Sequence, residues 1–97
     1  MVKHVVFFKF RPGVSEEKIQ QLEKGLSGLP ALIPEIMEFQ VGRDVVRSER
    51  SYDLALISAF SDLEALQRYQ VHPEHQAVVA LVREISEKVA AVDFEYA

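Results

Sequence analysis

The stretch VKHVVFFKF, residues 2–10, decides how this chain folds. Nearly every residue in it is β-branched or aromatic, which is typical of a β-strand. Successive side chains of a strand point to opposite faces of the sheet. The even-numbered positions place His4, Val6 and Phe8 on one face, and the odd-numbered positions place Val5 and Phe7 on the other. Both faces are apolar, so we expect this strand to be covered on both sides.

A turn and a helix are predicted to follow this strand. Residues 11–13, Arg-Pro-Gly, break the strand, and Ser15 ahead of two glutamates is typical of a helix N-terminus. An apolar stripe at helical spacing then predicts the buried side of the helix: Ile19, Leu22, Leu26 and Leu29. Gly28 and Pro30 are predicted to mark its end.

Two further strands and a second helical region are predicted next. Alternating apolar residues indicate strands over residues 36–46 and 52–60, joined as a hairpin through a polar connection. The tetrapeptide Ser61-Asp62-Leu63-Glu64 matches the S-x-x-E capping box, which predicts a short helix. Pro73 suits the first position of another helix, where a missing N–H costs nothing.

A final strand over about residues 89–96 completes the order β-α-β-β-α-α-β. Two β-α-β units in series are typical of an α+β, ferredoxin-like fold, in which a four-stranded antiparallel sheet carries helices on one face. Alternation sends a set of apolar side chains to the other face: Val5, Phe7, Ala55, Ile57 and Ala59. Because soluble monomers rarely expose large apolar patches, we predict a homodimer that pairs sheet to sheet.

Composition argues against several classes of protein. The length of 97 residues fits one domain, residues 1–97, and eleven basic against fifteen acidic residues argue against nucleic acid as a partner. The absence of cysteine excludes disulfides and thiolate catalysis. The N-terminus lacks a signal-peptide pattern and no apolar run approaches the roughly 20 residues of a membrane span. We therefore expect a cytoplasmic protein without a membrane partner.

The segment Tyr69-Gln70-Val71-His72-Pro73-Glu74-His75 holds the candidate chemistry. Histidine is the side chain that gains and loses a proton near neutral pH. Structural roles remain open for each polar group: His75 as a helix-start residue bonded to the backbone, His72 as a helix cap, and Tyr69 as a core ring. His72 and His75 have no nearby third ligand, so no metal site is expected.

Three motifs together resemble the stress-responsive A/B barrel domain family over nearly the whole chain. They are the opening strand, residues 52–56 with the sequence Tyr-Asp-Leu-Ala-Leu, and the pattern Tyr69-x-x-His72-Pro73-x-His75. The resemblance implies a dimeric α+β barrel. The best understood enzyme of that family, a plant polyketide cyclase, holds its substrate between the sheet and the helices and uses no metal or redox cofactor. The resemblance therefore implies no cofactor here.

The resemblance also implies roles for individual residues. His75 is the expected general base, Tyr69 the phenol that polarises a substrate carbonyl, and Asp93 the carboxylate that orients the histidine. Six residues are expected to line the pocket: His4, Val6, Phe8, Leu26, Leu54 and Leu56. Leu54 and Leu26 stand where the cyclase has a histidine and a tyrosine, which implies a more apolar pocket and a different substrate.

If Asp93 contacts His75, the carboxylate is expected to outweigh the helix dipole and keep the pKa of His75 near or above about 6.5. Two functions remain open on the sequence alone. One is a cofactor-free cyclase, isomerase or lyase acting on a small apolar carbonyl compound. The other is a non-catalytic, stress-associated oligomer or binding module whose pocket is filled by its own side chains.

Overall fold

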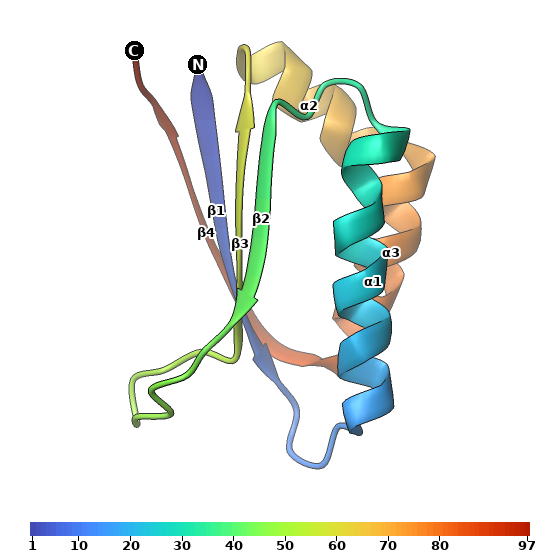
Figure 1. Cartoon of the computed structure of the whole chain (residues 1–97), viewed down its shortest axis with the longest axis vertical. Coiled ribbons are helices and arrows are strands. Elements are labelled where there is room, and N and C mark those ends of the chain that lie inside the picture. The colour runs from blue at the N-terminus through green and yellow to red at the C-terminus, as the bar shows by residue number, and fades with distance from the viewer.

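The computed structural model describes all 97 residues and contains a four-stranded antiparallel sheet with helices against one face (Figure 1). The elements follow the predicted order: β1 Val2–Phe10, α1 Glu16–Leu32, β2 Glu38–Arg43, β3 Leu54–Phe60, α2 Leu63–Val71, α3 Pro73–Ile85 and β4 Ser86–Glu95. The α+β, ferredoxin-like fold expected from the sequence is confirmed. No helix combines the length and the apolarity needed to cross a membrane.

The sheet has the strand order β2-β3-β1-β4, so the opening strand lies inside it. In this register Val6 pairs with Leu56 on one side and with Ala91 on the other. His4 pairs in the same way with Asp93 on β4. The register shifts near the end of β1, where Lys9 pairs with Lys88 and Phe10 with Ser86. One residue of β4, Glu87, is therefore extra at this point and forms a β-bulge.

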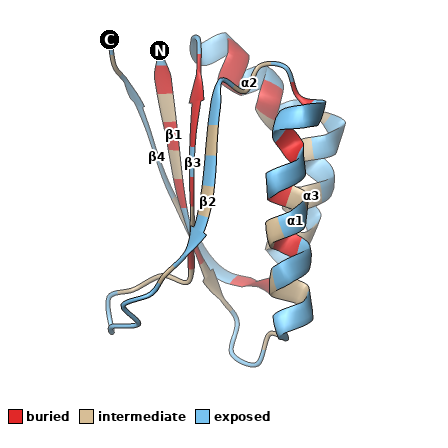
Figure 2. Cartoon of the chain, in the orientation of Figure 1, coloured by how far each residue is buried: buried red, intermediate tan, exposed pale blue.

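The hydrophobic core lies between the sheet and the helices. Figure 1 shows α1 and α3 side by side over one face of the sheet, with α2 near its upper end. The buried positions gather on this side in Figure 2, whereas much of the outer surface of the helices is exposed. The predicted stripe of α1 contributes Leu22, Leu26 and Leu29, all fully buried. Burial of this stripe against the sheet holds the helical layer in place.

Two helix ends differ from the prediction. Helix α1 runs past Gly28 and Pro30 to Leu32, and the amide of Ile33 closes it with a 2.9 Å bond to the carbonyl of Leu29. Because Leu29 and Ile33 are both buried, core packing outweighs the proline near the end of the helix. The predicted capping box is also displaced by one residue. Asp62, not Ser61, caps α2 by accepting a 2.8 Å hydrogen bond from the amide of Ala65.

The strand ends differ for a local reason as well. Strands β2 and β3 are shorter than predicted because the connection between them is held by its own polar contacts. The carboxylate of Asp44 accepts a 2.6 Å bond from the amide of Arg47, and Asp53 accepts bonds from Arg47 and from the amide of Phe10. Strand β4 begins earlier than predicted, at Ser86, directly after α3 ends at Ile85.

The sheet face opposite the helices is apolar and exposed. Four large side chains keep 40% to 63% of their surface in solvent: Phe7, Ile57, Val92 and Phe94. Ala59 is an exception to the predicted exposed set, because it is fully buried. It lies in register between Lys3 and Glu38, and the 3.3 Å ion pair between these two side chains spans it.

Candidate active site

A cavity of about 420 Å³ lies between the helix-facing side of the sheet and the helices. Fourteen residues line it, ten of them hydrophobic: His4, Val6, Phe8, Leu26, Leu56, Tyr69, Gln70, His75, Val78, Val79, Val82, Arg83, Val89 and Ala91. Small-molecule sites are commonly clefts of about 300 to 1,000 Å³ with apolar walls and a few polar groups. The volume and the lining of this cavity fit that description.

Tyr69 is the most deeply buried polar residue of the cavity. Its ring packs with centroid distances of 4.9 Å to Phe60 and 4.3 Å to His75. Its hydroxyl is buried and has no hydrogen-bond partner. Burial raises the pKa of the Tyr69 phenol, so the group keeps its proton at neutral pH. The hydroxyl is thus an unused hydrogen-bond donor on a residue that lines the cavity.

His75 is the third residue of α3, and the break between α2 and α3 fixes the orientation of its ring. In a continuous helix the amide of Glu74 would bond to the carbonyl of Gln70. Here that amide donates instead to Nδ1 of His72, at 3.1 Å, because His72 caps α3. The carbonyl of Gln70, which lacks this helical partner, accepts a 3.0 Å bond from Nδ1 of His75 and a 2.5 Å bond from the side-chain amide of Gln76. The bond from Nδ1 leaves the lone pair of His75 on Nε2.

The pKa of His75 is lowered, because the contact with Asp93 on which the expected higher value depended is not made. Burial lowers this pKa, and the nearby His4 and His72 lower it further. The hydrogen bond to the Gln70 carbonyl raises the pKa but does not cancel these effects. The expected value near or above about 6.5 applied only if Asp93 contacted His75, and Asp93 contacts His4 instead. The imidazole is therefore neutral at neutral pH and can accept a proton on Nε2.

Asp93 contacts His4, not His75. Its carboxylate is hydrogen-bonded to Nδ1 of His4, the residue directly opposite on β1. His4 is buried, lines the cavity, and has its ring centroid 6.2 Å from that of Tyr69. The expected orienting carboxylate thus exists, but it orients the other histidine. Tyr69 lies between two histidines that are each held by a different partner.

Most of the predicted pocket residues line the cavity. His4, Val6, Phe8, Leu26 and Leu56 are at its walls. Leu54 is not: it is buried in the core at the start of β3, opposite Phe8. His72 takes the structural role of capping α3.

Sequence reasoning missed the contribution of α3 to the wall of the cavity. Val78, Val79, Val82 and Arg83 recur at helical spacing from His75 and share its side of the helix. That spacing was a usable signal. Gln70 was also missed, and no side-chain pattern predicts it, because it orients His75 through its backbone carbonyl.

The arrangement suits hydrogen bonding to a carbonyl group and proton transfer next to it. Tyr69 offers a donor, and His75 offers a neutral nitrogen on a ring whose centroid is 4.3 Å from that of Tyr69, in a largely apolar space. Nowhere in the structure do three histidine, cysteine or acidic side chains gather as a metal site would require.

The chain is similar to known proteins over nearly its full length. The family model described as "Stress Responsive A/B Barrel Domain" matches residues 2–96. The stress-response A/B barrel domain-containing protein HS1 of Arabidopsis thaliana is 34% identical over 96 residues, which are 97% of this chain and 88% of that protein. Olivetolic acid cyclase of Cannabis sativa is 27% identical over 95 residues, covering 96% of this chain and 94% of the cyclase.

A solved structure extends the similarity to three dimensions. A dimeric protein of unknown function with a ferredoxin-like fold from Bacteroides fragilis superposes with a TM-score of 0.88 and 34% identity. The match covers 98% of this chain and 95% of that one. Its fold agrees with the β-α-β-β-α-α-β arrangement described above.

Proposed function

The chain belongs to the stress responsive A/B barrel domain family, and from this premise we propose that it is a homodimer that binds a small, largely apolar carbonyl compound in the cavity of each subunit. We further propose that the cavity converts this compound by cofactor-free acid–base chemistry of cyclase, isomerase or lyase type. One observation carries the proposal: the Tyr69 hydroxyl is buried without a partner beside His75. Leaving such a group unpaired costs about 1 to 3 kcal/mol, which a bound carbonyl oxygen would offset.

The proposed chemistry assigns one task to each side chain. The Tyr69 O–H donates a hydrogen bond to the ligand carbonyl oxygen. Nε2 of His75 accepts a proton from the adjacent carbon, and the negative charge that develops on the oxygen is stabilised by the same Tyr69 hydrogen bond. The resulting imidazolium then returns its proton to the product. Asp93 acts as a positioning residue in this scheme, because it reaches the cavity through His4.

The comparison with olivetolic acid cyclase supports a reaction of this class, since that relative is named as a cyclase. The apolar walls of the cavity, Leu26 among them, support a less polar ligand. The open volume supports a binding site over the alternative of a non-catalytic module with a pocket filled by side chains.

The homodimer is supported by the outer face of the sheet and by a dimeric relative. The relative from Bacteroides fragilis is dimeric. Phe7, Ile57, Val92 and Phe94 are exposed on the face away from the helices. Burying a large apolar side chain contributes roughly 1.5 to 3 kcal/mol, so a second copy packed on this face would be favourable.

Hydrogen–deuterium exchange on a simple ketone tests the proposed proton abstraction. Methyl heptyl ketone is incubated with the protein in deuterated buffer, and proton NMR follows the signal of the hydrogens next to the carbonyl. We expect the wild-type protein to accelerate their exchange. His75→Ala should slow the protein-dependent exchange by about a hundredfold or more, since a positioned general base contributes about 10² to 10⁴ in rate.

Two further variants separate the chemistry from the fold. Tyr69→Phe should also slow the exchange, because it removes the donor to the carbonyl. Tyr52→Phe is the matched control, because it removes a phenol hydroxyl outside the cavity lining. Exchange no faster than in buffer alone, or equal exchange in His75→Ala, would contradict the proposal.

A further inference from the structure

One face of α3 changes character along its length. His75 stands near the N-terminal end of the helix, Val78, Val79 and Val82 line the middle of the cavity wall, and Arg83 follows. Eight residues separate His75 from Arg83, which is about 12 Å along the axis at 1.5 Å per residue. The wall thus presents a proton acceptor, an apolar surface and a cation in that order.

Arg83 carries a positive charge that no carboxylate balances. Arg43, Arg47 and Arg68 each form ion pairs with neighbouring carboxylates. The acidic residue next to Arg83, Glu84, is bonded at 2.9 Å to Lys18. Arg83 makes no ion pair and no side-chain hydrogen bond, although it lies at the rim of an apolar cavity.

Resting on the proposed function, we propose that the ligand is an amphiphilic carbonyl acid, with its carbonyl group at Tyr69, its apolar chain against the valines of α3, and its carboxylate bound by Arg83. The planar guanidinium presents parallel N–H donors that match the two oxygens of a carboxylate. One guanidinium balances the single charge of a carboxylate, which favours this group over a doubly charged phosphate.

A matched pair of ligands that differ only in charge tests this inference. Decanoate and methyl decanoate share an apolar chain, and titration calorimetry gives the affinity of each for the intact protein. We expect decanoate to bind wild type more tightly than the ester does. Arg83→Gln should weaken decanoate about 3- to 10-fold, between the effects of an exposed ion pair and a charge-assisted hydrogen bond. The affinity of the ester should not change.

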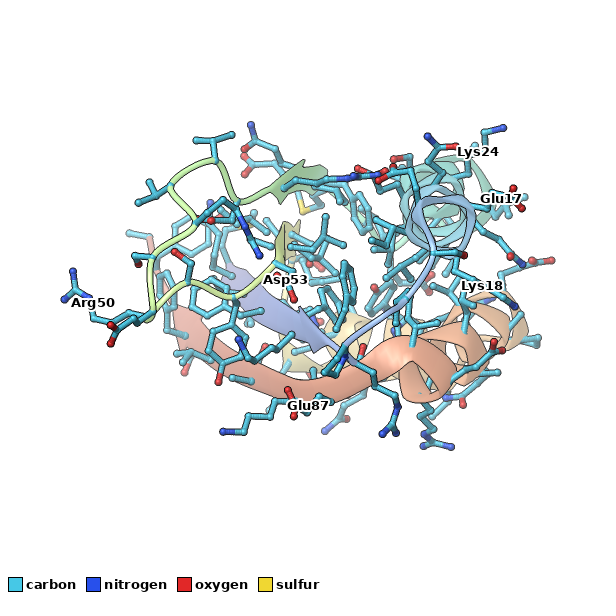
Figure 3. The ribbon with its side chains drawn as sticks, turned by 90° about the horizontal axis from the view of Figure 1, so that it is seen from below. Glu17, Lys18, Lys24, Arg50, Asp53 and Glu87 are labelled. Carbon is cyan, nitrogen blue, oxygen red and sulfur yellow. The ribbon has the colours of Figure 1, made fainter.

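Two variants control for charge and for helix structure. Arg50→Gln removes an equally unpaired arginine from the loop that Figure 3 shows on the opposite side of the molecule from the helices, and it should leave both affinities unchanged. Arg83→Lys keeps a cation in the last turn of α3, where it suits the helix dipole, and should retain part of the preference for decanoate.

The outcomes distinguish this inference from the function on which it rests. Equal loss of decanoate binding in Arg50→Gln and Arg83→Gln would overturn it, because the effect would then come from net charge. Unchanged decanoate binding in Arg83→Gln would also overturn it. If exchange on methyl heptyl ketone still depended on Tyr69 in that case, the proposed function would remain supported. If neither ligand bound wild type and no exchange occurred, both would fail.

Discussion

The buried Tyr69 hydroxyl destabilises the protein without ligand, although the proposed function requires it. It is buried without a hydrogen-bond partner, whereas the ring beneath it packs well in the core. We therefore expect Tyr69→Phe to raise the free energy of unfolding by about 1 kcal/mol in the absence of ligand, as measured by urea denaturation. Tyr52→Phe, which changes a tyrosine outside this cavity, should leave stability unchanged. A less stable Tyr69→Phe protein would show that the hydroxyl already has a partner in solution.

Because burial lowers the pKa of His75, its contribution to stability decreases as the pH falls. Burial lowers its pKa in the folded protein, so the folded state prefers the neutral ring while the unfolded chain titrates at about 6.5. Its contribution is present above about pH 6.5 and is lost as the pH falls toward the lowered native value, because the unfolded state then binds more protons. His75→Gln should therefore lose less stability than wild type between about pH 7.5 and about pH 5 in urea titrations. An identical loss in both proteins would contradict this assignment.

Which residues line the cavity was more predictable than which side chains contact one another there. Tyr69 and His75 are six residues apart, and both line the cavity as expected. The partner of Asp93 was not predictable from the segment, because it depends on the register between β1 and β4, which brings Asp93 opposite His4. The pKa of His75 depends on the same register, because the expectation for it was conditional on a contact with Asp93.

At the scale of the elements, the junction between α2 and α3 depends on His72. Its ring accepts the amide of Glu74 at 3.1 Å, which an alanine cannot do. We expect His72→Ala to lower the free energy of unfolding by about 1 kcal/mol, the usual effect of losing a helix cap, and His72→Asn to restore most of it. Thermal or urea unfolding of the two variants measures the difference. Equal stability of both variants would show that Pro73 alone defines this helix start.

Element types were more predictable than element ends. The opening strand and the helix starts at Ser15 and Pro73 follow local signals that the structure confirms. The end of α1 was misplaced because the burial of Ile33 overrides Pro30, and burial is a property of the tertiary structure. The hairpin strands were predicted too long because the carboxylates of Asp44 and Asp53 hold the loop between them through hydrogen bonds to backbone amides. An alternating pattern of apolar residues gives no information about such bonds.

At the scale of the whole molecule, the outer face of the sheet should determine the oligomeric state. A lysine in place of Phe7 would have to be buried in a sheet-to-sheet interface, so we expect Phe7→Lys to halve the mass measured by light scattering at micromolar concentration. Val71→Lys is the control, since Val71 is 74% exposed but lies on α2 rather than on the sheet. A monomeric wild type, or a dimeric Phe7→Lys, would contradict the proposed interface.

The ferredoxin-like arrangement could be predicted because each strand and helix has its own local sequence pattern. The cavity could not be predicted in this way. Its walls come from three strands and three helices, and its volume is what their side chains leave unfilled. Leu54 illustrates the difference: its face of the sheet was predicted correctly, but it lies in the closed part of the core.

The bulge at Glu87 is the place where β4 can lose a residue without changing the pairing that follows. Glu87 has no partner on β1, so its deletion would leave Ser86 opposite Phe10 and Lys88 opposite Lys9. The loss of one residue between Val89 and Val92 would instead exchange the faces of the residues after it, and Asp93 would leave His4 for the outside of the sheet. Relatives that keep the Asp93–His4 pair should therefore tolerate a one-residue difference at the bulge but none between the bulge and the pair, which an alignment of their sequences would test.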